Sequence, residues 1–186
     1  MKQDIARWND RYRLANPNPD FQPNPLLRHY RTLLEGKGKV LDVACGVGHN
    51  ALFLAELGNE VVAVDGSLVG LAYCQERLRD RALSVALVAA DLERFFPPAN
   101  YFDMVLVVRY HDRRLFSRWS AALRSGGLFI YHTFNRNLLQ TRPHFPRHYL
   151  LERGELSRRL RRFCVLATND GPGMQDTESY WIGYKS

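Results

Sequence analysis

Short apolar runs alternate with amphipathic segments along most of the chain. Five runs rich in Val, Leu, Ile and Ala have the length of buried strands, and they span residues 40–45, 60–65, 84–89, 104–108 and 128–132. Segments that favour helices lie between them, at residues 50–57, 67–79 and 114–123. Strands that alternate with helices through short connections predict a parallel sheet with helices on both faces.

The pattern changes after residue 132. A helix is predicted over residues 151–162, and strands are predicted over 163–168 and 177–184, with a short loop between the two strands. Two successive strands without a helix between them form a hairpin, so the last strand enters the sheet antiparallel. The sequence therefore predicts an α/β fold, a doubly wound, seven-stranded and mostly parallel sheet with an antiparallel last strand.

The first 39 residues have a different character. Trp8 and Tyr12 are predicted to anchor a short helix, and the proline-rich stretch 16–25 is predicted to be a loop. Residues 26–34 favour a second helix. We therefore predict two parts, an N-terminal helical arm or lid at residues 1–39 and a domain at residues 40–186, because a loop-flanked arm is the easiest element to move.

A glycine-containing turn follows the first predicted strand. Gly46 and Gly48 lead directly into a helix whose free N–H groups can bind a ligand, and Asp65 follows at the distance expected of a ribose-binding acid. Glycine spacing alone also fits a dinucleotide site. Asp42 lies inside the apolar strand, where it would repel a pyrophosphate and attract a cationic group. Asp42 and the terminal hairpin make a dinucleotide oxidoreductase the weakest interpretation.

The stretch Asp42–Asn50 reads Asp-Val-Ala-Cys-Gly-Val-Gly-His-Asn. It resembles the first motif of the class I S-adenosylmethionine (SAM)-dependent methyltransferases. Cys before the first Gly and Asn after the second resemble the tellurite-resistance (TehB-like) and methyltransferase type 11-12 group. The resemblance implies a Rossmann-like methyltransferase fold, with SAM as the cofactor.

The resemblance also implies roles for individual residues. Asp65 would bind the ribose hydroxyls, Asp91 and Leu92 would bind adenine, and Asp42 would face the methionine moiety. The cofactor residues implied in this way are Asp42, Ala44, Gly46, Gly48, Asn50, Asp65, Gly66, Ser67, Asp91, Leu92, Val108 and Arg109.

The segment after the fourth strand borders the methyl group in this family. Arg109, Tyr110 and His111 are the catalytic candidates, with Arg109 as a donor to an anionic acceptor and His111 as a general base. The segment lacks the D/N-P-P-Y/F motif that similar enzymes use on nucleobases or glutamine, which argues against those substrates. Candidate substrate residues are Trp8, Tyr12, Arg136, Arg142 and His144, although loop residues of this kind are often simply exposed.

The formal charge of +7 leaves a nucleic acid, a membrane surface or an anionic small substrate open. The densest basic run, residues 158–162, has Leu156 and Leu160 at helical spacing, so a solvated helix face explains it and a nucleic-acid partner is not favoured. No apolar run is long enough to span a membrane and no signal-peptide core follows Met1, so we expect a cytoplasmic protein without a membrane partner. The oligomeric state stays open.

Three cysteines, Cys45, Cys74 and Cys164, lie in apolar segments without metal-binding spacing. We therefore expect three buried free thiols and no metal site.

The sequence thus predicts a SAM-dependent methyltransferase that acts on a small-molecule acceptor. One acceptor that fits this prediction is a soft anionic S, Se or Te centre. A soft acceptor needs no general base. Two rivals stay open: an RNA- or protein-modifying methyltransferase, and a nonenzymatic SAM-binding protein.

Overall fold

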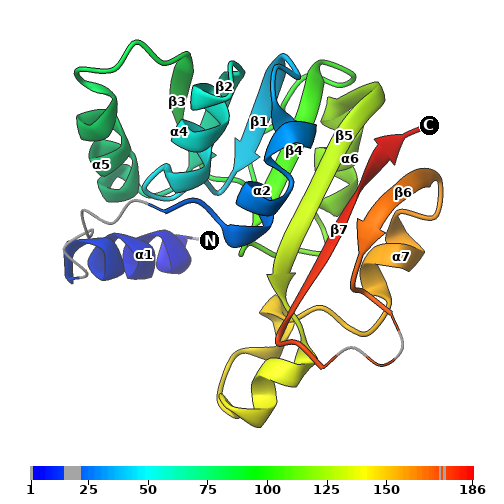
Figure 1. Ribbon diagram of the computed structural model, residues 1–186. Coiled ribbons are helices and arrows are strands. Elements are labelled where there is room, and N and C mark those ends of the chain that lie inside the picture. Colours follow the sequence, from blue (N-terminus) through cyan, green and yellow to red (C-terminus); the bar gives the residue numbers. More distant parts are fainter. Residues whose placement is uncertain (1, 15–21, 172, 174) are drawn as a thin grey trace. The chain divides into compact units, whose positions relative to one another are not determined.

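The computed structural model describes residues 2–14, 22–171, 173 and 175–186 (Figure 1). Most of the predicted proline-rich loop, residues 16–21, lies outside the described residues. The chain folds as two compact units, residues 1–96 (unit 1) and residues 97–186 (unit 2). The first helix groups with unit 1, and the predicted arm boundary at residues 39 and 40 stays a prediction.

Unit 1 contains three parallel strands in the order β3-β2-β1. Its elements are α1 (Lys2–Leu14), α2 (Pro25–His29), α3 (Arg31–Leu34), β1 (Lys39–Val43), α4 (His49–Glu56), β2 (Glu60–Asp65), α5 (Leu68–Leu78) and β3 (Val85–Ala89). The apolar runs form these strands because both faces of a central parallel strand are covered, and four of the five residues of β1 are buried.

Two helices of unit 1, α2 and α5, begin at a side-chain cap. The Ser67 hydroxyl accepts the N–H of Gly70 and caps α5. The Asn24 side chain accepts the N–H of Leu26 at the start of α2, where Pro25 takes the first helical position. The predicted helix at residues 26–34 is divided at Tyr30, which separates α2 from α3.

Gly48 is required by packing inside unit 1. It starts α4 with a left-handed backbone (φ +83°), and a Cβ there would collide with the Cys74 sulfur. Gly58 has a similar φ (+81°), but no atom lies within 4 Å of where its Cβ would be. A substitution at Gly58 therefore reports the backbone strain without overpacking. We expect Gly48→Ala to lower the free energy of unfolding by about 1–3 kcal/mol more than Gly58→Ala, because overpacking adds to the strain. Urea unfolding of both variants measures this, and equal losses would contradict it.

Unit 2 contains four strands that lie side by side in the order β4-β5-β7-β6 (Figure 1). Its elements are β4 (Phe102–Val108), α6 (Phe116–Ala122), β5 (Leu123–Phe134), the 3-10 helices η1 (Arg136–Gln140) and η2 (Arg147–Tyr149), α7 (Glu155–Arg159), β6 (Phe163–Thr168) and β7 (Glu178–Lys185). β4 and β5 are parallel, whereas β7 runs antiparallel to both of its neighbours. The predicted fold class, seven mostly parallel strands with a reversed last strand, is confirmed.

Two elements of unit 2 differ from their predicted extent. The predicted turn at residues 125–127 lies within β5, where the register moves from Leu123 opposite Phe102 to Leu128 opposite Met104. The helix predicted at 151–162 is wrong in extent, because α7 spans only five residues. Leu151 cannot be helical, since it forms a bridge with Asn135.

Aromatic side chains fill the interior of unit 2. Phe129 contacts the rings of Phe116, Tyr131 and Phe163, and Phe163 also contacts Trp181. Cys164, on the edge strand β6, is exposed, so the prediction of three buried thiols is correct only for the other two cysteines. In the described part of the chain, none of the helices has the length and apolarity that a membrane span requires.

Candidate functional site

The turn between β1 and α4 has an unusual backbone. Ala44 and Gly46 both adopt left-handed conformations, each with φ of +58°. A left-handed residue other than glycine costs of order 1 kcal/mol, and such strain is common at ligand-binding turns. The N–H of Cys45 donates to the Val64 carbonyl, which ties the turn to β2. The glycine turn therefore lies at the carboxyl ends of β1 and β2, the edge where α/β sheets bind ligands.

Asp42 is the most unusual acid of unit 1. Its side chain lies at the end of β1 and the residue is only 1% exposed. One carboxylate oxygen accepts the N–H of Ala51, whereas Oδ2 has no hydrogen-bond partner among the described residues. Burial, followed by the nearby Asp65, raises the pKa of Asp42 to about 8. An unsatisfied buried carboxylate oxygen suits a cationic ligand group.

Asp65 holds the glycine turn against the start of α5. Its carboxylate accepts the N–H of Gly46 at 2.8 Å and that of Ser67 at 2.7 Å, and it also accepts the N–H of Gly66. Burial nevertheless raises the pKa of Asp65. Because a carboxylate has about four acceptor sites, Asp65 can also accept hydrogen bonds from a diol.

One face of α1 covers the same turn. This face carries three residues at helical spacing, Ile5, Asn9 and Tyr12. Each of them contacts a residue of the predicted cofactor site. The Tyr12 hydroxyl lies 2.5 Å from where a Gly46 Cβ would be, so a larger side chain at that position would displace Tyr12. Burial, and then Asp65, raises the pKa of Tyr12.

Asn9 is a site residue that the sequence did not reveal. Its Oδ1 accepts the Ser67 hydroxyl at 2.6 Å. The two residues are far apart in the chain, and no local pattern marks Asn9. Ile5, which packs on Gly66, was missed for the same reason.

The remaining cofactor candidates of unit 1 have structural contacts of their own. The Asp91 carboxylate accepts the N–H of Glu93, which closes a turn after β3, and Leu92 is buried. Ala90 donates its N–H to the Asp65 carbonyl, so this turn lies beside the end of β2. The Asn50 side chain accepts the N–H of Asn24 and joins α4 to the segment before α2.

In unit 2, Arg109 follows Val108 at the end of β4 with a left-handed backbone (φ +54°). Its N–H donates to the His132 carbonyl, and its guanidinium pairs with Glu178 at 3.1 Å. His132 Nε2 lies 2.9 Å from the other oxygen of Glu178. The hydrogen bond from His132 and the charge of Arg109 lower the pKa of Glu178. The charge of Arg109 is thus already matched by a carboxylate, a partner that the sequence did not reveal.

His111 lies in the interior of unit 2. Its Nδ1 is 2.8 Å from the Tyr131 hydroxyl, and its Nε2 is 3.9 Å from Glu155. Burial lowers the pKa of His111 to about 4, so its ring is neutral at physiological pH. Tyr110, the third catalytic candidate, is half-buried. The catalytic roles of Arg109, Tyr110 and His111 stay predictions.

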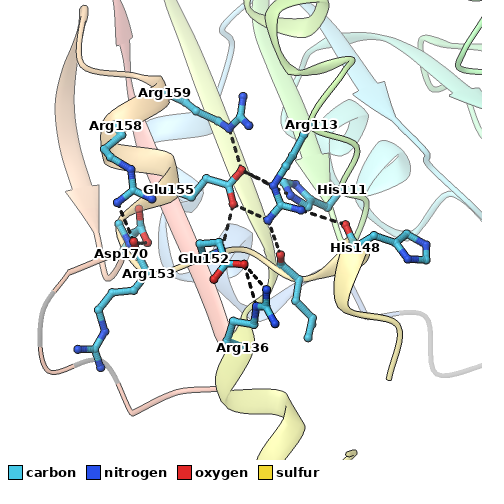
Figure 2. A network of polar contacts seen from close by, with 12 residues as sticks. His111, Arg113, Arg136, His148, Glu152, Arg153, Glu155, Arg158, Arg159 and Asp170 are labelled. Carbon is cyan, nitrogen blue, oxygen red and sulfur yellow. Dashed lines mark hydrogen bonds and ion pairs between the residues drawn. The ribbon is translucent and has the colours of Figure 1, made fainter. Parts of the chain in front are cut away.

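Glu155 is the centre of the polar network drawn in Figure 2. Arg113 donates two hydrogen bonds to its carboxylate, and Arg159 donates another at 2.8 Å. Burial alone would raise the pKa of Glu155, but the hydrogen bonds from Arg113, the Glu152 N–H and Arg159 together outweigh it and lower the pKa to about 2.

The predicted substrate residues lie in different environments. Arg136 pairs with Glu152 in the same network, whereas Arg142 and His144 are exposed between η1 and η2. In unit 1 the ring of Trp8 packs against that of Tyr12. Among the described residues, no cluster of three or more His, Cys, Asp or Glu side chains is arranged to hold a metal ion.

Comparison with known proteins identifies the fold and its family. The model of the family described as "Methyltransferase domain" matches residues 40–127. The chain carries a class I methyltransferase domain. The ubiquinone biosynthesis O-methyltransferase of Methylocella silvestris is 32% identical to it over 127 residues, which are 66% of this chain and 46% of that protein. The chain thus spans less than half the length of such curated relatives.

Solved structures share the fold of this methyltransferase domain. TehB from Haemophilus influenzae superposes with a TM-score of 0.69 at 16% identity, over 87% of this chain and 61% of that one. A SAM-dependent methyltransferase from Aquifex aeolicus gives a TM-score of 0.69 at 13% identity, over 96% of this chain and 98% of that one. The predicted membership of the class I SAM-dependent methyltransferases is confirmed.

Proposed function

We propose that this chain binds SAM at the glycine turn and transfers its methyl group to a small-molecule acceptor. The observation that carries the proposal is the unsatisfied Oδ2 of Asp42 beneath the glycine turn of a methyltransferase domain. At a pKa of about 8 this acid is mostly protonated at neutral pH, and a cationic group beside it favours the ionised form. The site therefore suits the cationic methionine part of SAM.

Different residues of unit 1 bind different parts of SAM. Asp65, already fixed by three backbone N–H groups, accepts the ribose hydroxyls, and Asp91 with Leu92 binds adenine. Ile5, Asn9 and Tyr12 of α1 shield the turn from water and serve as the lid. SAM supplies an electrophilic methyl group on a sulfonium, so the protein contributes mainly position and exclusion of water.

The acceptor we propose is a hydroxyl group of a small molecule. The support is the likeness to relatives named as O-methyltransferases. A hydroxyl acceptor must lose a proton, and His132, whose Nε2 lies 2.9 Å from Glu178, and the more deeply buried His111 are the candidate bases. An S, Se or Te acceptor, which needs no base, stays a prediction that methylation assays with thiols test.

Calorimetric titration with SAM, S-adenosylhomocysteine and NAD tests the cofactor. We expect the two adenosyl-sulfur compounds to bind and NAD not to bind. Asp65→Ala is expected to weaken SAM binding about thirtyfold to a hundredfold, since it removes charge-assisted hydrogen bonds of about 2–3 kcal/mol in total.

Glu60→Ala is the matched control, because Glu60 is an exposed acid at the opposite end of the same strand. It is expected to leave the affinity for SAM unchanged. Binding of NAD alone, or equal losses in the two variants, would exclude the proposed site.

A further inference from the structure

The positive charge of the protein belongs to unit 2 alone. Residues 97–186 hold 14 Lys and Arg against seven Asp and Glu, whereas residues 1–96 hold 12 of each. The whole formal excess of +7 therefore lies in one compact unit. A charge excess confined in this way favours contact with an anionic surface.

Four arginines of this excess lie around α7 and lack an ion-pair partner among the described residues: Arg153, Arg158, Arg161 and Arg162. All four are exposed. The two carboxylates nearest in the chain already have partners, since Glu152 pairs with Arg136 and the buried Glu155 is bonded to Arg113 and Arg159. The interactions within unit 2 therefore leave the charge of these four side chains available to a partner.

Asp170 fixes α7 beside the edge strand β6. Its carboxylate accepts the N–H of Gly154 at 2.8 Å and that of Ser157 at 2.9 Å, and it follows β6 in the chain. Arg158 also donates a hydrogen bond to the Arg153 carbonyl. Asp170 therefore holds the start of α7 against the end of β6, and we call the basic segment 153–162 together with β6 the α7–β6 edge.

The α7–β6 edge also carries exposed aliphatic side chains. Val165 is 58% exposed and Leu166 is 51% exposed, on a strand whose other edge pairs with β7. The register shift between Val165 and Ala167 interrupts β6, and such bulges disfavour pairing with a further strand. The exposed aliphatic pair is therefore poorly suited to extending the sheet with a second copy of the chain.

We infer that the α7–β6 edge binds the surface of an anionic phospholipid bilayer. The four arginines contact the phosphate headgroups, and Val165 and Leu166 enter the boundary between headgroups and acyl chains. This association needs no spanning helix, and it departs from the expectation, drawn from the sequence, of no membrane partner. It goes beyond the proposed function and does not depend on the cofactor.

Other occupants fit the α7–β6 edge less well. Single-stranded nucleic acid is bound by basic grooves with aromatic side chains for base stacking, whereas the large exposed apolar residues of this edge, Val165 and Leu166, are aliphatic. A second copy of the chain offers no compensating charge, because unit 1 is formally neutral and unit 2 is positive. A bilayer supplies both the negative charge and the apolar layer.

Sedimentation of the full chain with lipid vesicles tests the inference. We expect binding to phosphatidylcholine vesicles that contain phosphatidylglycerol, little binding to phosphatidylcholine alone, and loss of binding at about 1 M salt. The triple variant R158Q/R161Q/R162Q is expected to lower the partition coefficient about a hundredfold, at about fivefold for each arginine. V165S/L166S is expected to lower it about tenfold on the same vesicles.

The matched control is R28Q/R31Q/R79Q, which removes the same charge from exposed positions of unit 1. It is expected to bind the anionic vesicles like the wild type, and circular dichroism confirms that each variant is folded. Equal losses in the two triple variants would overturn the inference, as would a V165S/L166S variant that binds like the wild type. Tight binding of poly(U) through the same arginines, without vesicle binding, would identify a nucleic-acid surface and also overturn it.

Discussion

Asp42→Asn is expected to raise the stability of the ligand-free protein at neutral pH. With a folded pKa of about 8, ionisation of this acid in the unfolded chain disfavours folding by up to about 4 kcal/mol at pH 7. Asparagine removes that penalty and can still accept the N–H of Ala51, although its buried amide adds donors that cost about 1–3 kcal/mol. We expect a net gain of about 2 kcal/mol, which corresponds to a rise in Tm of about 4–8 °C.

The difference in stability between Asp42→Asn and the wild type changes with pH. The pKa of Asp42 is raised in the folded state, so its contribution to stability is complete below about pH 4 and is lost as the pH rises toward 8. The Tm of Asp42→Asn minus that of the wild type should therefore be negative near pH 4, where only the cost of the buried amide remains, then rise through zero and level off above about pH 8. Thermal unfolding at a series of pH values measures it.

Asp80→Asn is the control, because Asp80 is exposed and should show a gap of less than about 0.5 kcal/mol at every pH. A constant gap for Asp42→Asn would contradict the raised pKa. The proposed function adds a second expectation, that Asp42→Asn weakens SAM binding, because a neutral amide cannot pair with a cationic group. A gain in stability with a loss of affinity would indicate that Asp42 is kept for ligand binding.

The acids at the ends of β1, β2 and β3 could be predicted because strand ends of a parallel sheet meet at one edge. Asp42 lies within its apolar run, Asp65 ends the second run and Asp91 closely follows the third, so the positions of the runs locate all three. The contacts that complete the site could not be predicted in this way. The hydrogen bond between Asn9 and Ser67 and the packing of Cys74 under Gly48 join residues far apart in the chain, and neither pair has a local pattern.

The region after β5 shows where local patterns mislead. Leucines at helical spacing predict a helix from residue 151, yet Leu151 is used as a bridge to Asn135 and α7 begins only at Glu155. The sequence likewise shows Glu155 as one more acid on a helix face. Its buried position between Arg113 and Arg159 depends on tertiary packing, which periodicity does not report.

Glu155→Gln is expected to destabilise the protein by about 3–5 kcal/mol, because it leaves the guanidinium of Arg113 partly buried beside a neutral amide. The side chain of Glu155 is only 6% exposed, so solvent does not screen this loss. Urea unfolding at pH 7 measures it. Glu152→Gln is the matched control within the network, since Glu152 is 46% exposed and pairs with Arg136 at the surface, which limits its effect to about 1 kcal/mol.

The lowered pKa of Glu155 determines how the destabilisation by Glu155→Gln changes with pH. Because that pKa is lowered from 4.5 to about 2, the stabilisation is present above about pH 4.5 and is lost as the pH falls toward 2. The wild type and Glu155→Gln should therefore converge in acid, while Glu152→Gln stays close to the wild type throughout. A small, pH-independent effect of Glu155→Gln would show that the network contributes little to folding. A large effect that converges in acid would identify Glu155 as a structural centre of unit 2.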